Sequence, residues 1–243
     1  MPDQIREEFM NHFIQCFNCG FTKECDRLST YRADHLQPQP GYIGKNYNGL
    51  VFLGGNPSAG GTGNHKNQAA ELYRLLNGLS GSKKEKDFDI AMDFLSKIMP
   101  SWYVMDRSLS DLPSLGTNLD DIAYINVFKC PTQKNGSNYS VHGNPYKLRV
   151  CFDKHTRTQL EILMPKTIIF LWKPLVRSMT ELGYDITSIN YSYWDGARSL
   201  SASKRQERLE EIKRIINDHY KNHKRPSRMK SKLRKMGVSD EHR

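Results

Sequence analysis

Short apolar runs alternate with longer amphipathic segments along this chain. The apolar runs are rich in β-branched and aromatic residues and predict four strands, over residues 50–53, 122–128, 167–172 and, more weakly, 186–191. The segments between them repeat apolar residues at helical spacing and predict helices over residues 68–79, 88–99, 148–163 and 174–182. Such alternation is typical of a parallel sheet with helices on both faces. We therefore expect an α/β fold, with three α/β/α layers around a mainly parallel, four-stranded sheet.

Both ends of the chain also carry helical patterns. Residues 4–14 form an amphipathic pattern that leads to a Cys-x-x-Cys pair. Ser203 is a good N-cap for a final helix with an apolar stripe on its core side. The stripe consists of Leu209, Ile212, Ile215, Ile216 and Tyr220. No such stripe persists further on, so we expect one domain over residues 1–220 and a basic, flexible tail over residues 221–243.

The positive charge is concentrated in this tail. The formal net charge is +10, and eight Lys or Arg lie between His219 and Lys235 with no acid among them, so the net charge without these eight is +2. The tail is either a solvated, frayed end of the chain or an arm that binds phosphate and loses affinity steeply with salt. A pI near 9.3 makes nucleic acid, here DNA, the leading class of partner.

Neither a membrane span nor a secretory signal is evident in the sequence. No run approaches the roughly 18 consecutive apolar residues of a transmembrane helix. The first residues carry acids, where a signal peptide is basic and then apolar. We expect a soluble, cytoplasmic monomer that binds no membrane.

Five cysteines point to metal binding. In a chain without a secretory signal, a disulfide framework is not the expected use of Cys16, Cys19, Cys25, Cys130 and Cys151. A Cys-x-x-Cys pair with two distant single cysteines supplies four thiolates. On local chemistry alone, four thiolates suit a structural zinc ion and a [4Fe-4S] cluster about equally.

A glycine-rich segment, GLVFLGGNPSAGGTG over residues 49–63, follows the first predicted strand. It has neither the Gly-Lys-Ser/Thr of a phosphate-binding P-loop nor the third glycine of the dinucleotide fingerprint. What remains is a tight turn whose backbone N–H groups can approach an oxyanion closely. Asn56 lies at its tip, where its amide can orient a water molecule or simply close an Asx-turn.

Three blocks of sequence resemble the uracil-DNA glycosylase superfamily. FLGGNPS, residues 52–58, is similar to its first motif, in which a strand ends in Gly, two variable residues, Pro and a small or aromatic residue. YINVFKC, residues 124–130, resembles the strand of the iron–sulfur uracil-DNA glycosylases that ends in Asn, two apolar residues, Lys and Cys. QLEILMPKTIIFLW, residues 159–172, is similar to that family's helix, Pro-Lys turn and third strand. The resemblance spans roughly residues 16–220 and is patchy outside these blocks.

The resemblance implies a metal centre. It assigns Cys16, Cys19, Cys130 and Cys151 as ligands of a structural [4Fe-4S] cluster in preference to zinc. The spacing from Cys130 to Cys151 is longer than the family pattern leads us to expect. Cys25 is left over, as a packed thiol or a substitute ligand. The metal would tie the N-terminal segment to the loop that follows the second predicted strand.

The resemblance also implies a nucleotide site. A glycosylase takes its target base out of the duplex, so it needs a group that reads the base and a group that positions water. Asn126 matches the base reader, since a carboxamide offers a donor and an acceptor to a pyrimidine; the alternative is a buried Asn that satisfies backbone groups. Asn56 matches the catalytic position that is Asp or Asn across the superfamily, and an amide there would orient water. The turn residues that would bind substrate are Gly54, Gly55, Pro57 and Ser58.

Three departures from the family pattern bear on specificity. Gly55 stands where the iron–sulfur families often carry Glu. The third motif lacks its usual histidine; the segment INYSYWDGARS, with Arg198, resembles instead the insertion loop of the mismatch-type thymine/uracil enzymes. The Pro-Phe that stacks on uracil is also missing, and His65 lies near that place in a polar loop. We expect a roomier, more polar pocket.

These features predict a monofunctional DNA glycosylase. No motif places a lysine for a Schiff base, so the product would be an abasic site without strand cleavage. The base would be uracil or a 5-modified cytosine, such as the hydroxymethyl or glucosylated cytosine of virus genomes, in base excision or antiviral defence. One alternative is a non-catalytic iron–sulfur DNA-binding module of the same fold. Another is a small zinc-bound nucleotide hydrolase.

Overall fold

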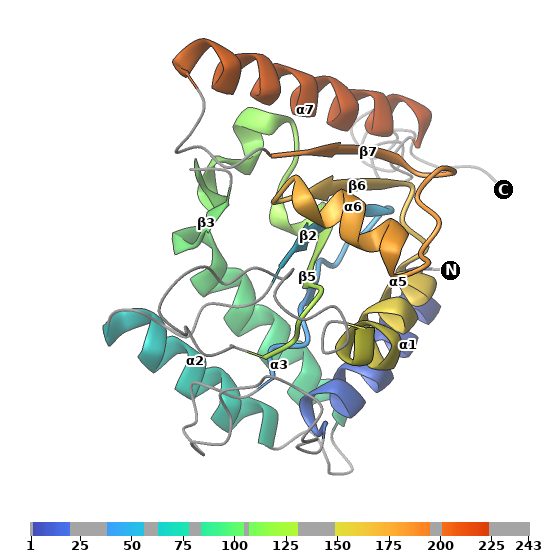
Figure 1. The fold of residues 1–243 in the computed structure, drawn as a ribbon. Helices are drawn as coiled ribbons and strands as arrows, with labels where there is room; N and C mark the ends of the chain where they lie inside the picture. The colour runs from blue at the N-terminus through green and yellow to red at the C-terminus, as the bar shows by residue number, and fades with distance from the viewer. Residues whose placement is uncertain are drawn as a thin grey trace, which may run out of the picture.

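A five-stranded, mainly parallel sheet forms the centre of the molecule (Figure 1). The computed structural model describes residues 2–19, 38–55, 63–77, 84–104, 107–130, 149–194 and 201–223. The strands of the sheet are β1 (Tyr42–Ile43), β2 (Leu50–Gly54), β5 (Ile122–Asn126), β6 (Thr167–Phe170) and β7 (Asn190–Tyr193). They lie in the order β1-β5-β2-β6-β7, and every pair is parallel except β1 with β5. A separate antiparallel pair joins β3 (Tyr103–Val104) and β4 (Arg107–Ser108).

The α/β class and the mainly parallel sheet are confirmed, whereas the predicted strand count of four is wrong. The fifth strand, β1, pairs antiparallel with β5 through Tyr42 and Tyr124. It is two residues long and so has no apolar run that could reveal it. The predicted strand over residues 186–191 is displaced to Asn190–Tyr193. Its first residues turn instead, because the Asp185 carboxylate accepts hydrogen bonds from the Thr187 backbone N–H and hydroxyl.

Helices cover the sheet and extend beyond the predicted bounds at several ends. Their bounds are α1 Pro2–Phe17, α2 Gly63–Leu76, α3 Lys84–Ile98, α5 Arg157–Leu163, α6 Pro174–Glu181 and α7 Ala202–Asn222. A π-helical segment, η7 (Phe152–Thr156), leads directly into α5. The remaining short turns are the 3-10 helices η4 Met99–Ser101, η5 Leu109–Leu115 and η6 Leu119–Asp121.

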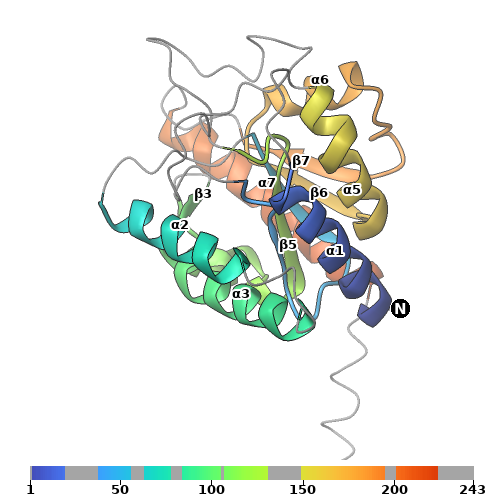
Figure 2. The same ribbon diagram turned by 90° about the horizontal axis from the view of Figure 1, so that it is seen from below.

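The helices associate in groups around the sheet. α7 runs along β7 and β6 (Figure 1). α1 lies beside α5, and α2 lies beside α3 (Figure 2). The N-cap of α7 is Ser201 rather than the predicted Ser203, and the Ser201 hydroxyl accepts from the Lys204 N–H. In the part of the chain that the structure describes, no helix is long and apolar enough to span a membrane.

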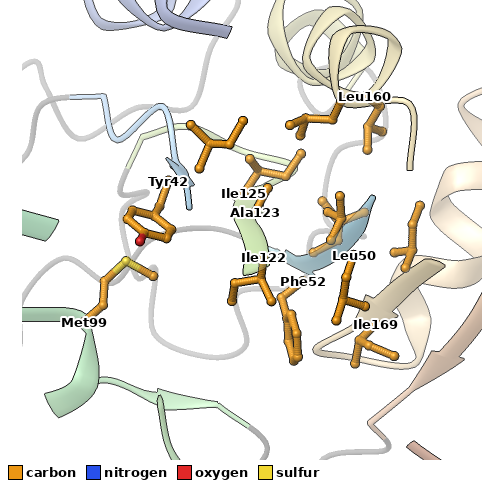
Figure 3. Close-up of a cluster of buried hydrophobic side chains, with 14 of the residues drawn as sticks. Tyr42, Leu50, Phe52, Met99, Ile122, Ala123, Ile125, Leu160 and Ile169 are labelled. Atoms are coloured by element: carbon orange, nitrogen blue, oxygen red, sulfur yellow. The ribbon is translucent and has the colours of Figure 1, made fainter. Parts of the chain in front are cut away.

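The core lies where β2 and β5 pack between helices (Figure 3). All five residues of β2 are buried, which explains why this strand reads as a continuous apolar run rather than an alternating one. Phe52 of β2 and Ile122 of β5 lie close together in this core, as Figure 3 shows. The parallel register pairs Leu50 with Ile122 and therefore brings Gly54 opposite Asn126, at the carboxyl ends of both strands.

Candidate functional site

The ends of β2 and β5 are joined beyond their last paired residues. The Val127 N–H donates to the Gly54 carbonyl (2.9 Å), and the Phe128 N–H donates to the Gly55 carbonyl (2.8 Å). A Cβ atom placed on Gly54 would lie 2.3 Å from Oδ1 of Asn126. Residue 54 must therefore be glycine if the Asn126 amide is to occupy its present position.

The Asn126 side chain borders a small cavity at this edge of the sheet. Asn126 is 5% exposed, and no residue in the described parts of the chain forms a hydrogen bond with its side-chain amide. The cavity has a volume of about 20 Å³, which holds about one water molecule. Its polar and aromatic lining comes from Phe13, Gln39, Tyr42, Trp102, Tyr124 and Asn126.

Two aromatic side chains shape one wall of this cavity. The rings of Trp102 and Tyr124 meet edge to face, with centroids 6.2 Å apart. Burial raises the pKa of Tyr124 to about 12, so its phenol stays neutral at physiological pH. The wall therefore offers aromatic surface and a neutral hydroxyl to the space beside Asn126.

The Asn126 backbone carbonyl is held by two buried donors. Nζ of Lys129 donates to it, and the Thr156 hydroxyl lies 3.4 Å from it while donating to the Val127 carbonyl at 2.7 Å. Lys129 is 1% exposed. Burial lowers the pKa of Lys129 to about 8, and the thiols of Cys16, Cys151 and Cys130 act in the opposite direction. One of the two groups that hold the end of β5, Lys129, is thus also coupled electrostatically to the cysteines.

Four cysteines distant in sequence gather beside this lysine. Cys16 lies in the last turn of α1 and Cys151 at the start of η7, both buried; Cys19 and Cys130 are half-buried. None of the four forms a disulfide. Burial raises the pKa of the Cys16 thiol well above its usual range, Lys129 lowers it, and the other three cysteines raise it further. The four thiols and Lys129 therefore share one electrostatic environment.

This cysteine group is not a preformed shell for a single ion. Within the described residues, no three His, Cys, Asp or Glu side chains converge closely enough to hold one metal ion. A zinc ion with four thiolates at about 2.3 Å requires the sulfur atoms to lie within about 4 Å of each other. The electrostatic coupling acts over longer distances than that and does not by itself define a metal site.

Two buried histidines lie next to the cysteine group. His12 precedes Cys16 by one helical turn, and His155 follows Cys151 by the same spacing. Their rings are 5.8 Å apart, and Nε2 of His12 lies 3.0 Å from the His155 carbonyl oxygen. Burial, with Lys129 nearby, lowers the pKa of His155 to about 3. Its two ring nitrogens are buried and have no hydrogen-bond partner among the described residues.

The structure places some of the predicted site residues and not others. Asn56, Pro57, Ser58 and Arg198 lie outside the described residues, as does Cys25. His65 was expected in a polar loop, and this is wrong for its backbone, which belongs to α2 (Gly63–Leu76). The apolar-helix pattern of that segment begins only at residue 68, so the first turn carries no signal of its own.

The predicted residues that the structure does describe fall into two neighbouring groups. Gly54, Gly55 and Asn126 meet at the carboxyl edge of the sheet. Cys16, Cys130 and Cys151 are coupled electrostatically to Lys129, and Cys19 is coupled to Cys16. Lys129 itself was missed as a site residue; the available signal was a lysine flanked by apolar residues and a cysteine directly after a buried strand.

Cationic and aromatic side chains gather at the end of β7. Tyr193 is contacted by Arg208, whose guanidinium carbon lies 4.4 Å from the ring centroid, and by Lys173, whose Nζ lies 5.2 Å from it. The Lys173 N–H donates to the Trp194 carbonyl, which joins the ends of β6 and β7. This surface lies at the same carboxyl edge of the parallel sheet as Asn126.

No protein-family model and no curated protein matches this chain. The case for a family therefore depends on the three sequence blocks and on the geometry described above.

Proposed function

We propose that this chain is a monofunctional DNA glycosylase of the uracil-DNA glycosylase superfamily, with that superfamily's three-layer fold. The observation that carries the proposal is the pairing of Gly54 with Asn126. The glycine leaves room for the Asn126 amide next to an aromatic wall, and an amide beside an aromatic surface can read and stack an everted pyrimidine. In open parallel sheets, ligands bind at the carboxyl ends of strands, which is where this pair lies.

Each proposed residue has a role in the excision of the base. The Asn126 amide donates to and accepts from the pyrimidine edge, and it has no competing partner among the described residues. Asn56 orients the attacking water, and the backbone N–H groups of the Gly54 turn stabilise negative charge on the leaving base. The pocket is completed by Pro57, Ser58, His65 and Arg198. The loop that carries Arg198 also fills the gap that the everted base leaves in the duplex. The bond between the sugar and the base breaks, and an abasic site remains.

DNA is the proposed partner. Two cations, Lys173 and Arg208, lie against the Tyr193 ring and place positive charge at the edge of the proposed pocket. Cations beside an aromatic ring suit a phosphate backbone next to an unstacked base. The basic tail adds further positive charge in the sequence. Affinity should therefore fall steeply as salt is raised.

The four cysteines fit a [4Fe-4S] cluster. The donor set would consist of thiols alone, and the resemblance to the iron–sulfur uracil-DNA glycosylases favours a cluster over zinc. Cys16, Cys19, Cys130 and Cys151 would hold it. When bound, the cluster would contribute folding free energy by joining α1 to the segment after β5 and to η7. It takes no part in the proposed excision.

The test is a panel of oligonucleotides that differ only in the pyrimidine's 5-substituent. Uracil, thymine, cytosine, 5-hydroxymethylcytosine and glucosylated 5-hydroxymethylcytosine would be presented in single strands and duplexes, and abasic sites revealed with alkali. We expect alkali-labile product for uracil or a modified cytosine, and a loss of at least about 100-fold in Asn126→Ala and Asn56→Ala. The matched control is Asn190→Ala, an exposed asparagine at the opposite end of β7, which should keep full activity.

A non-catalytic DNA-binding module is favoured by one observation, the small volume of the cavity beside Asn126. Such a module would bind DNA in the same salt-dependent manner and give no alkali-labile product on any member of the panel. That result would contradict the glycosylase proposal.

A further inference from the structure

Tyr193, the last residue of β7, has a cation against its ring from each of two neighbouring segments. The guanidinium carbon of Arg208, in α7, lies 4.4 Å from the ring centroid. Nζ of Lys173, directly before α6, lies 5.2 Å from the same centroid. The ring is half-buried, so part of it remains open to solvent. The end of β7 therefore presents aromatic surface in a positive environment.

The two cations are held to very different degrees. Only 19% of the Arg208 side chain is exposed. Its guanidinium donates to the Glu211 carboxylate, and a second nitrogen lies 3.5 Å from the Tyr193 hydroxyl. Lys173, by contrast, is exposed, and an exposed cation–π contact is weak. Arg208 therefore fixes the ring, whereas a flat ligand that stacks on the ring can replace Lys173.

Tyr193 lies at the same carboxyl edge of the sheet as the candidate pocket. The register runs from Tyr193 through Phe170 and Leu53 to Ile125, the residue before Asn126. Three strand spacings separate β7 from β5, which is about 14 Å at roughly 4.8 Å per spacing. A nucleic-acid strand covers this distance in roughly four stacked steps of about 3.4 Å. One strand can therefore reach both Asn126 and Tyr193.

The chemistry of this surface fits an unpaired nucleotide. Lys204 and Arg205 are exposed one turn before Arg208 and add positive charge at the start of α7. Cations contact phosphates, and an aromatic ring stacks on a base. In a duplex the bases are stacked on one another and offer only their edges to a protein. The face of the Tyr193 ring can therefore take a base only from a strand that is unpaired at that point.

We infer that Tyr193 is a stacking platform for an unpaired base that lies a few nucleotides from the base at Asn126, so that the partner is single-stranded DNA. The incoming base replaces Lys173 on the ring, and the released ammonium contacts a phosphate. Arg208 holds the ring in place. This inference rests on the proposed function for the choice of DNA, and it adds a strand preference to that function.

The test measures binding of a fluorescently labelled single strand of about 12 adenines to the full-length protein by anisotropy. Tyr193→Leu should weaken binding at least about tenfold, because the stacking surface is lost. Tyr193→Phe keeps the ring and should bind within about twofold of the wild type. Tyr191→Leu is the matched control. It removes an exposed tyrosine of the same strand, whose ring meets Phe170 edge to face, and should bind like the wild type.

A second strand of the same length, with abasic spacers in place of every base, separates stacking from charge. It keeps all the phosphates, so the wild type should bind it at least about tenfold more weakly than the adenine strand. In Tyr193→Leu this difference should largely disappear. Lys173→Gln should lower the salt slope of binding by roughly 0.7. Arg177→Gln, which removes an exposed cation paired with Glu181, should leave the slope unchanged.

Thermal unfolding shows whether each variant is folded, and if Tyr193→Leu is not, the wild-type comparison of the two strands decides. Equal binding of both strands by the wild type would overturn the inference, as would equal losses in Tyr193→Leu and Tyr191→Leu. Tighter binding of a duplex than of the adenine strand would also overturn it. Neither single strand contains a pyrimidine, so a failure of the excision assay counts against the proposed function and leaves the stacking platform to be judged by these measurements.

Discussion

Two buried histidines show how differently this molecule treats polar groups in its interior. His219 of α7 is 2% exposed, and both ring nitrogens are paired, Nδ1 with the Thr167 hydroxyl (3.0 Å) and Nε2 with Oδ1 of Asn48 (2.9 Å). His155 of η7 is 4% exposed, and neither ring nitrogen has a partner among the described residues. His219 joins α7 to the sheet. His155 lies near Lys129, and its buried ring nitrogens form no hydrogen bond within the described residues.

The two histidines differ in how far their buried ring nitrogens are hydrogen-bonded. An unpaired buried polar group costs about 1 to 3 kcal/mol, so natural proteins keep such groups rare and place them where function requires them. The π-helical segment that carries His155 is also a type of irregularity that occurs frequently at functional sites. Within the described residues, single buried polar atoms of Asn48, Gln68, Asn118 and Gln159 also lack a partner, but His155 lacks one at both ring nitrogens.

The largest expected effect comes from loss of a cysteine ligand. Cys16→Ser should abolish the broad absorbance near 400 nm of an iron–sulfur centre. It should also lower the free energy of unfolding by more than about 4 kcal/mol, the stabilisation that a ligand gives at about a thousand times its Kd. Absorbance spectra and denaturant unfolding measure both. Cys25→Ser is the matched control and should change neither; equal loss in both variants would show that Cys16 has no special role.

Gly54→Ala should have the next largest effect. Its new Cβ would lie 2.3 Å from Oδ1 of Asn126, so the amide must move. We expect a loss of about 1 to 3 kcal/mol in stability from overpacking and a loss of at least about 100-fold in excision. The double variant Gly54→Ala with Asn126→Ala should recover most of the stability but not the activity. Without that recovery, the clash with Asn126 is not the cause.

Substitution of each histidine by Phe tests directly whether the paired and the unpaired ring contribute differently to stability. His219→Phe leaves Asn48 and Thr167 without their partner and should cost about 1 to 3 kcal/mol, with unchanged absorbance near 400 nm. His155→Phe removes no hydrogen bond of its ring and should cost less in the iron-free protein. Thermal unfolding of both variants, with and without iron, gives the four values needed. A larger cost for His155→Phe in the iron-free state would reverse the interpretation.

The smallest effect is a pH dependence. Burial, followed by the effect of His223, lowers the pKa of His219 to about 4, whereas an unfolded histidine titrates near 6.5. Between these values the unfolded chain binds a proton that the folded chain does not, so stability falls as pH drops from about 6.5 to about 4. His219→Phe should flatten this slope by about 1 to 2 kcal/mol over the window, after allowance for solvent screening. Unfolding at pH 7 and pH 4.5 measures it, and identical slopes would contradict the assignment.

The strands were predictable from the sequence where a strand is long enough to show as an apolar run. β2 and β5 are buried on both faces and appear as apolar runs, so residues 50–53 and 122–128 located them to within two residues. β1 could not be located, since two residues have no periodicity and pair only because β5 offers a free edge. The π turn of η7 also has no local sequence signal.

The sequence indicated candidate site residues but not how the fold connects them. The resemblance of residues 124–130 to a known family nominated Asn126, and that resemblance together with the Cys-x-x-Cys spacing nominated the four thiols. Lys129 could not be nominated, because lysine is almost never fully buried and the sequence alone places it on the surface. Its burial comes from tertiary packing of α1, η7 and the end of β5, which no local pattern encodes.

The most direct test of this account is the metal content of the protein purified without oxygen. We predict that the unpaired His155 and the neighbouring Lys129 border an iron–sulfur centre, while His219, with both ring nitrogens paired, has a structural role. We therefore expect about four iron and four sulfide per chain, with no stoichiometric zinc. One zinc per chain, or a fully folded protein without metal, would contradict it.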